Sequence, residues 1–201
     1  MSMFITFEGP EGSGKSTVMQ AIAKRLDQPL ITTREPGGIR ISEAIRELLL
    51  SDDYHMDART EALLFAASRR QHLVEKVVPA LNAGQIVLCD RFIDSSLAYQ
   101  GYARGIGAAE IMSINQFAIE SYMPDLTLYL KVDPEIGLTR IMSNQRETNR
   151  LDNESLAFHQ RVCEGYDQLA NTYDRIVTID AAQPIDKVIE DAYQVIIKKL
   201  D

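Results

Sequence analysis

Residues 9–16 read Gly9-Pro10-Glu11-Gly12-Ser13-Gly14-Lys15-Ser16, which matches the phosphate-binding pattern G-x-x-x-x-G-K-[ST]. An apolar run at residues 3–7 precedes this loop, and a helix-like run at residues 16–23 follows it. A strand, a glycine-rich turn and a helix N-terminus in this order direct backbone N–H groups and the helix dipole at one anion. Lys15 can reach the β- and γ-phosphates, and the Ser16 hydroxyl can bind Mg²⁺. The sequence therefore predicts a site for a nucleoside triphosphate.

The composition is that of an ordinary globular protein, with 45% hydrophobic and 25% charged residues in a chain of 201. This length fits a single domain over residues 1–201. The net charge of −8 argues against a nucleic acid polymer as a partner, because the phosphate backbone requires a basic surface. No stretch approaches the ~18 apolar residues of a membrane span, and the first strand begins too early for a signal peptide. We therefore expect a cytoplasmic protein that does not bind membranes.

The two cysteines and three histidines follow no metal-binding spacing. Cys89 ends an apolar run and is expected to be a small buried residue in a reducing compartment. Its long separation from Cys163 gives little support for a disulfide. The scattered histidines, His55, His72 and His159, are interpreted as solvated side chains.

Apolar runs alternate with helix-length segments along the whole chain. Strands are expected at residues 3–7, 30–33, 85–90, 126–132 and 175–180. Helices are expected at residues 16–23, 40–51, 58–83 and 107–121, and after the prolines at 134 and 184. This alternation predicts an α/β, three-layer P-loop NTPase fold with a five-stranded parallel sheet flanked by helices. Pro79 is expected to kink the third helix or to begin a new one, and Gly84 to end it. The most polar stretch, residues 143–154, is interpreted as a short, mobile surface lid.

Ligands of such a sheet bind beyond the carboxyl ends of its strands, so residues that follow the strands are candidate site residues. Arg34 and Arg91 follow the second and third strands, and two guanidinium groups beside a triphosphate suggest a second, phosphorylated ligand. Each could instead pair with the acid next to it, Glu35 or Asp90. Asp90 also has the position of a Walker-B carboxylate that holds Mg²⁺, although it could simply cap the next helix.

Phe65 and Arg69 lie four residues apart in the helix expected at residues 58–83, and therefore on one face of it. A ring and a charged donor in this arrangement could together hold a planar base. Phe65 could equally be a core residue.

Five segments carry a family resemblance: Phe7–Thr17, Thr33–Gly38, Leu64–Arg70, Asp90–Gly101 and Pro124–Thr127. They resemble the bacterial thymidylate kinases, P-loop nucleoside monophosphate kinases that transfer the γ-phosphoryl group of ATP to dTMP for dTTP synthesis. The phosphate loop is generic to the superfamily, whereas the second and fourth segments are specific to this family. The one departure is Phe92, where tyrosine is commoner, and we expect no change of activity from it.

The resemblance implies a site residue at each matching position. ATP would be bound by Gly9, Pro10, Glu11, Gly12, Ser13, Gly14, Lys15, Ser16 and Thr17, with Arg140 against the adenine near Ala181 and Gln183. Mg²⁺ would be held by Ser16 and Asp90. The dTMP site would consist of Glu11, Arg34, Pro36, Arg46, Phe65, Arg69, Arg91, Ser96, Tyr99 and Gln100.

Within the dTMP site, the resemblance implies that Phe65 stacks on thymine, that Arg69 donates to its O4, and that Ser96 and Gln100 meet its remaining polar edge. Tyr99 would exclude a ribose 2′-OH, and Glu11 would bind the 3′-OH. Three arginines, Arg34, Arg91 and Arg46, would hold the phosphate. A cis peptide bond is implied before Pro36.

Family members differ in the origin of a catalytic arginine, which lies either in the phosphate loop or in the lid. The loop of this chain contains no arginine, so the chain resembles the lid-arginine class. Of the two arginines in residues 143–154, Arg146 is favoured as the catalytic one, acting with Lys15, Arg34 and Arg91. Arg150 could instead anchor the lid to Asp152 or Glu154.

Two alternatives remain. The first is another P-loop kinase, acting on a different nucleoside monophosphate or on a deoxynucleoside. A deoxynucleoside kinase would need a carboxylate base near the sugar 5′-OH, for which Glu8 or Glu35 is available, but the paired arginines count against an acceptor without a phosphate. A GTP-dependent switch would carry an Asn-Lys-x-Asp stretch, which the sequence lacks. A homodimer is expected from the resemblance, with apolar helix residues around 65–81 and 107–121 as its interface.

Overall fold

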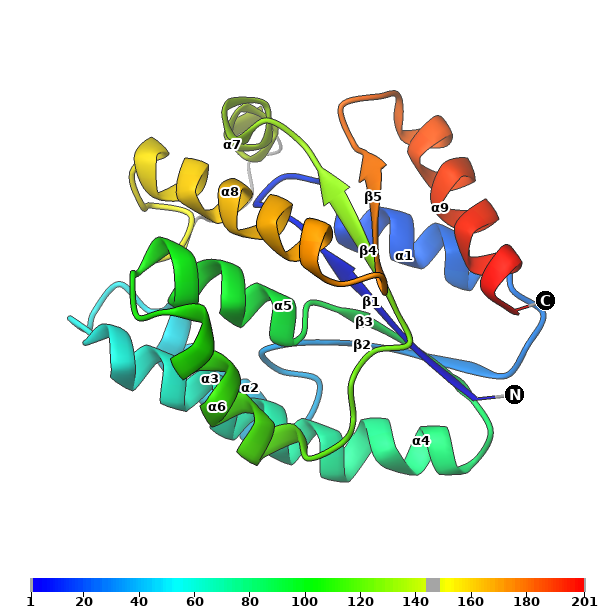
Figure 1. Cartoon of the computed structure of the whole chain (residues 1–201), viewed down its shortest axis with the longest axis horizontal. Helices are drawn as coiled ribbons and strands as arrows, with labels where there is room; N and C mark the ends of the chain where they lie inside the picture. Colours follow the sequence, from blue (N-terminus) through cyan, green and yellow to red (C-terminus); the bar gives the residue numbers. More distant parts are fainter. Residues whose placement is uncertain (1, 144–148, 201) are drawn as a thin grey trace.

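The computed structural model describes residues 2–143 and 149–200 and contains one parallel sheet (Figure 1). The strand order is β2-β3-β1-β4-β5, and every neighbouring pair is parallel. The strands are β1 (Met3–Glu8), β2 (Leu30–Arg34), β3 (Ile86–Asp90), β4 (Leu126–Lys131) and β5 (Ile176–Asp180). The predicted five-stranded parallel sheet is confirmed, with each strand within one residue of its expected ends.

Helices cover both faces of the sheet, so the predicted three-layer arrangement is also confirmed. One face is covered by α1 (Lys15–Ala23) and α9 (Ile185–Leu200), which lie together on the right of Figure 1. They pack on Ile5 and Leu128, whereas the neighbouring residues Phe4 and Tyr129 point into the other layer. This alternation is that of strands buried on both faces, as in sheets with crossover helices.

The layer on the other face of the sheet contains most of the remaining helices. Its core receives side chains from α3 (Ala58–His72), the π-helical turn η1 (Leu73–Val77), α4 (Val78–Asn82), α5 (Ile93–Ser96), the π-helical segment η2 (Leu97–Ala103), α6 (Ala108–Ile119) and α8 (Leu156–Thr172). Two further helices, α2 (Arg40–Leu50) and α7 (Pro134–Ser143), pack on α3 and α8 respectively. Within the described residues, no helix is long and apolar enough to cross a membrane.

The helix expected at residues 58–83 is present, but it is built from three consecutive pieces, α3, η1 and α4. Pro79 lies in the first turn of α4, which continues directly from η1. Gly84, with φ of 78°, follows the end of α4 in the left-handed conformation. The predicted positions of these two residues are confirmed.

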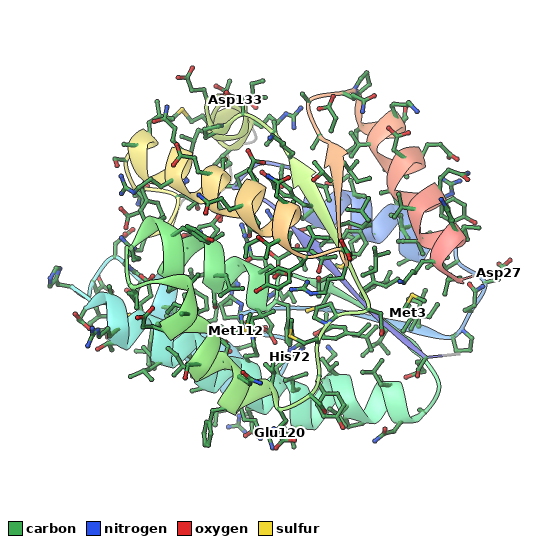
Figure 2. All side chains as sticks on the ribbon, in the orientation of Figure 1. Met3, Asp27, His72, Met112, Glu120 and Asp133 are labelled. Atoms are coloured by element: carbon green, nitrogen blue, oxygen red, sulfur yellow. The ribbon has the colours of Figure 1, made fainter. Side chains whose placement is uncertain are left out.

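The interpretation of all three histidines as solvated is wrong for two of them. His72 and His159 are fully buried, and Figure 2 shows His72 in the interior, away from surface residues such as Asp133. Burial of His72 is tolerated because Thr33 Oγ1 and Glu35 Oε1 lie 2.7 and 2.8 Å from its two ring nitrogens. His159 packs edge-on against the Phe158 ring. Cys89 is buried as expected.

Candidate nucleotide-binding site

The phosphate loop connects the end of β1 to the first residue of α1, as expected. Two of its glycines, Gly12 and Gly14, have φ of 71° and 88°, in the left-handed region that favours glycine. A Cβ on Gly12 would lie 2.0 Å from the Gly137 carbonyl oxygen, so the loop touches the backbone of α7. The loop is thus held between α1 and α7 with the N-terminus of α1 behind it, which is the geometry of an anion site.

Lys15 is buried and donates to the loop itself. Its Nζ lies 3.0 Å from the Gly9 carbonyl oxygen, 2.8 Å from that of Pro10 and 3.2 Å from Ser13 Oγ. Burial, followed by the charge of Arg91, lowers the Lys15 pKa to about 8. A triphosphate on the loop would replace these neutral acceptors with anionic ones and favour the charged ammonium.

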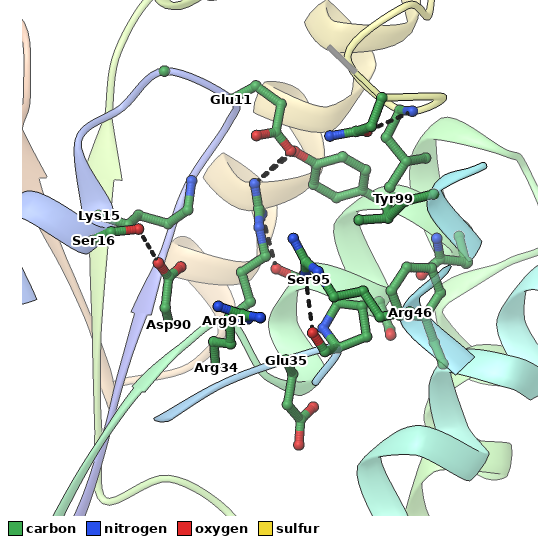
Figure 3. Close-up of a pocket in the computed structure, with 18 of the residues that line it drawn as sticks. Glu11, Lys15, Ser16, Arg34, Glu35, Arg46, Asp90, Arg91, Ser95 and Tyr99 are labelled. Carbon is green, nitrogen blue, oxygen red and sulfur yellow. Dashed lines mark hydrogen bonds and ion pairs between the residues drawn. The ribbon is translucent and has the colours of Figure 1, made fainter. Parts of the chain in front are cut away.

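Ser16 and Asp90 form a pair of oxygen ligands at the mouth of the loop (Figure 3), where the Ser16 hydroxyl donates to the Asp90 carboxylate. Mg²⁺ prefers oxygen ligands and is commonly held by one or two protein groups together with water and substrate phosphates. Within the described part of the chain, no group of three or more His, Cys, Asp and Glu residues is placed to hold a metal ion. The pair therefore suits a metal carried largely by a nucleotide.

A cavity of about 380 Å³ opens beyond the carboxyl ends of β1, β2 and β3. It brings together most residues predicted for the site: Glu11, Gly12, Gly14, Lys15, Ser16, Thr17, Arg34, Pro36, Arg46, Phe65, Asp90, Arg91, Ser96, Tyr99 and Gln100. Its lining also includes five residues to which the sequence assigned no contact with dTMP or ATP: Glu35, Leu50, Ser95, Asn149 and Leu151. Glu35 and Ser95 lie inside family-specific segments, whereas the other three carry no local signal.

Arg91 lies at the centre of this cavity and pairs with the phosphate loop (Figure 3). Its Nη2 donates to Glu11 Oε1 at 2.6 Å, and the Tyr99 hydroxyl donates to the same oxygen at 3.1 Å. Its φ of 69° is a left-handed conformation that is uncommon outside glycine. The alternative in which Arg91 pairs with the neighbouring Asp90 is therefore wrong.

Arg34 and Arg46 face the same cavity from β2 and α2. Arg34 Nη2 donates to both Glu43 carboxylate oxygens at 2.9 and 3.0 Å, so its partner is not the neighbouring Glu35. Arg46 donates to the Pro36 carbonyl oxygen at 2.9 Å, and the peptide bond before Pro36 is cis, as expected. Burial and then the charge of Arg34 lower the Arg46 pKa. These cations repel one another, and an anion in the cavity would relieve that repulsion.

Arg69 lies behind the cavity rather than in its lining. Its guanidinium donates to two lining residues, to Glu35 Oε2 at 2.8 Å and to Ser96 Oγ at 3.1 Å. It also donates to Asn115 Oδ1 and, at 2.9 Å, to the Phe92 carbonyl oxygen. Phe65, on the same helix face, does line the cavity. In this structure Arg69 therefore holds the cavity wall in place through Glu35 and Ser96, while the ring of Phe65 is available to a base.

A second cavity, of about 570 Å³, lies on the other side of the phosphate loop. It brings Ser13 together with Arg140, Ala181 and Gln183, the residues expected around adenine. Arg140 Nη1 donates to the Ala181 carbonyl oxygen at 3.0 Å, which fixes α7 against the end of β5. Gly9 and Pro10 line neither cavity and instead accept hydrogen bonds from Lys15.

Arg146, the favoured lid arginine, lies outside the described residues. Arg150 is an anchor, but its partner is Glu61 of α3 rather than an acid of its own segment. The distance from Arg150 Nη2 to Glu61 Oε2 is 2.7 Å, and its Nε donates to the Leu49 carbonyl oxygen at 2.9 Å. Leu151 is buried against the cavity. Residues 149–154 are thus partly buried rather than wholly on the surface, whereas the mobility of the lid stays a prediction.

A triphosphate loop beside a cavity that three arginines face suits an acceptor with a phosphate of its own. This combination is typical of the P-loop nucleoside monophosphate kinases. The family model described as thymidylate kinase matches residues 7–192. The chain therefore belongs to the thymidylate kinase family, and the resemblance seen in the sequence is confirmed.

Individual relatives agree with this assignment. A thymidylate kinase of Clostridium novyi is 62% identical over 94% of this chain and 95% of its own length. One from Staphylococcus epidermidis is 57% identical over the whole of both chains. The crystal structure of thymidylate kinase from Ehrlichia chaffeensis superposes with a TM-score of 0.80 at 35% identity, over 97% of this chain and 98% of that one.

Proposed function

We propose that this site phosphorylates dTMP with ATP, giving dTDP and ADP. The observation that carries the proposal is the cavity next to the phosphate loop, into which Arg34, Arg46 and Arg91 all face. A nucleoside would bring no phosphate to satisfy these cations, and nothing in the comparisons favours the alternative of a deoxynucleoside kinase. The chain therefore has the activity of its family.

The cavity lined by the arginines takes dTMP in this proposal, and the cavity around Arg140 takes the adenine end of ATP. Phe65, Ser96 and Gln100 meet the base, and Tyr99 and Glu11 lie near the sugar. Lys15 leaves the loop carbonyls to bind the phosphates of ATP. Ser16 and Asp90 would hold Mg²⁺, which would neutralise charge on those phosphates.

Catalysis in this arrangement is mainly alignment and charge neutralisation. Phosphoryl transfer requires donor and acceptor oxygens in line, and the phosphate oxygen of dTMP is already anionic, so no general base is needed. Arg91 and Arg34 hold the acceptor, and Lys15 stabilises charge on the donor. Glu8 is not required as a base: it is fully buried and accepts from the Phe92 N–H at 2.7 Å and from Ser95 Oγ.

Acceptor specificity tests this function directly. ADP formation is measured with ATP and dTMP, dUMP, the ribose form of TMP, or thymidine as separate acceptors. Turnover with dTMP well above the other three is expected. Preference for thymidine would mean that the arginines are misread, and equal turnover without any acceptor would leave only an ATPase.

The two lid arginines are expected to differ. Arg146→Ala should lower kcat by about 10²-fold or more with little change in the Kd of dTMP, because it removes a charge used in the transition state. Arg150→Ala should act mainly through protein stability, because its guanidinium is already bound to Glu61 and Leu49. Turnover and calorimetric dTMP binding are measured for both variants. Normal kcat in the Arg146 variant would exclude it as the catalytic arginine.

A homodimer is the proposed assembly, through an apolar surface formed by Leu63, Val74 and Phe117. These side chains are exposed on α3, η1 and α6, with Phe117 89% accessible, and α3 packs beside α6. Light scattering should give twice the 22.6 kDa chain mass for the wild type and one chain mass for Phe117→Asp. Met142→Asp, at an exposed position on α7, is the control and should remain dimeric. A monomeric wild type would exclude the dimer.

The single domain over residues 1–201 and the cytoplasmic location stay predictions. The location is supported by Cys89 and Cys163, which are both free thiols, as is usual in a reducing compartment.

A further inference from the structure

Glu61 is a buried carboxylate to which neither the motifs nor the proposed reaction gives a role. It lies in the first turn of α3, with 1% of its surface exposed. Its Oε1 accepts from Gln100 Nε2 at 2.8 Å and from Arg104 Nε at 3.3 Å. Its Oε2 accepts from Arg104 Nη2 at 3.1 Å and from Arg150 Nη2 at 2.7 Å. One carboxylate thus joins α3 to the cavity wall and, through Arg150, to the C-terminal part of the lid.

The two guanidinium groups keep Glu61 ionised. Burial alone would raise the pKa of this carboxyl, but the hydrogen bonds from Arg104, Gln100 and Arg150 outweigh burial and lower it. An ionised carboxylate accepts hydrogen bonds and cannot donate them. The side-chain amide of Gln100 can therefore face Glu61 only through its NH₂ group, because its carbonyl oxygen would be repelled there.

This constraint fixes which end of the Gln100 amide serves the cavity. With Nε2 bound to Glu61, the carbonyl oxygen is the acceptor that Gln100 can offer to a ligand, and Gln100 lines the cavity. Thymine and uracil carry a hydrogen on N3 and need an acceptor there. Cytosine has a bare N3 that itself needs a donor.

We propose that Glu61 is a positioning residue for base selection: it orients Gln100 to accept from the N3–H of thymine or uracil, and so selects against cytosine. The proposal rests on the placement of the base against Gln100 in the proposed function. Polar sites of this kind discriminate because the wrong base leaves buried groups unpaired.

The test compares kcat/KM for dTMP, dUMP and dCMP in Glu61→Gln. Glutamine at position 61 has nearly the same shape but can donate as well as accept, so the Gln100 amide can turn. The kcat/KM for dTMP divided by that for dCMP is expected to fall about tenfold, which corresponds to the free energy of one hydrogen bond. The ratio of dTMP to dUMP should stay unchanged, because both bases carry the N3–H. An equal loss with all three acceptors would show a structural role only and overturn the proposal.

Two further variants complete the experiment. Glu61→Asp keeps a carboxylate for both arginines, but the shorter side chain moves it away from Gln100. The ratio of kcat/KM for dTMP to that for dCMP should therefore fall in this variant too, which provides a test if Glu61→Gln folds poorly. Arg104→Gln disturbs the same cluster but leaves the Glu61 bond to Gln100, so its ratio should match the wild type. A ratio that falls equally in Arg104→Gln would overturn the proposal. Gln100→Leu tests the placement of the base separately from the role of Glu61. An unchanged ratio of kcat/KM for dTMP to that for dCMP in this variant would mean that the base does not lie against Gln100.

Discussion

Arg91→Ala is expected to lower kcat/KM for dTMP by about 10²–10³-fold, the size of the loss when one fixed donor is removed from charge that develops in a transition state. The side chain is held in place by Glu11 and by the Gly9 carbonyl oxygen, which lies 3.0 Å from Nη1. A guanidinium held in this way already lies at the cavity when the acceptor binds, although its bond to Glu11 must then be exchanged for one to the phosphate. Steady-state kinetics with dTMP and ATP varied separately measure the effect, and the KM for ATP should change by less than about threefold.

Two variants serve as comparisons for this result. Arg91→Lys keeps the charge but loses the planar fork, so it should recover only part of the activity. Arg34→Ala should cost about tenfold, because the Arg34 side chain is 53% exposed and its pairing is screened by water. A kcat/KM for dTMP within threefold of the wild type in Arg91→Ala would contradict the assignment of Arg91 to the acceptor phosphate.

Among the described residues, the cations proposed to bind phosphates each have a partner within the protein. Lys15 donates to loop carbonyl oxygens, Arg34 to Glu43, and Arg91 to Glu11. These partners reduce the cost of gathering positive charges around one cavity. They also mean that substrate binding is an exchange, in which phosphate oxygens replace acceptors of the protein. The net free energy of substrate binding is therefore smaller than the number of new hydrogen bonds suggests.

The sheet could be predicted from sequence because each strand carries a local signal. Phe4 and Ile5 in β1, for example, are apolar on both sides of the pleat, as a strand between two helical layers requires. The helical stretch η2 was missed, since Leu97–Ala103 has a π-helical hydrogen-bonding pattern and contains Gly101. This segment packs against α8 and α6, and such tertiary contacts leave no signal in the local sequence.

The candidate site was predictable where residues follow strands and not where distant segments meet. Asp90 and Arg91 end or follow β3, so the fold alone places them at the sheet edge. Leu50 reaches the cavity from α2 and Leu151 from the C-terminal part of the lid. The two segments meet through contacts about 100 residues apart in sequence, such as Arg150 Nε to the Leu49 carbonyl oxygen. The burial of His72 was missed for the same reason, because its partners Thr33 and Glu35 come from a different element.

Arg69→Met should lower the free energy of unfolding by about 3–5 kcal/mol, the cost of removing one partner from a buried ion pair. Arg69 and Glu35 are both almost fully buried, and Arg69 Nε lies 2.8 Å from Glu35 Oε2. The other Glu35 oxygen lies 2.8 Å from His72 Nδ1, so the carboxylate is held between two helix residues. Only 4% of Glu35 is exposed where it borders the cavity, so water can replace little of what the arginine supplies. Urea denaturation at 25 °C measures the change. Arg25→Met, which breaks the exposed ion pair with Glu190, is the control and should cost at most about 1 kcal/mol.

The double variant Arg69→Met/Glu35→Gln separates an uncompensated charge from lost packing. If the penalty comes from leaving the Glu35 carboxylate unpaired, making position 35 neutral should recover a large part of it. If it comes from the donors that Arg69 supplies to Ser96, Asn115 and Phe92, the double variant should be no more stable than Arg69→Met. The first result would identify Arg69 as the charge that allows a carboxylate to be buried beside the cis bond at Pro36. The second would make Arg69 a hydrogen-bonding support for the cavity wall that includes Ser96.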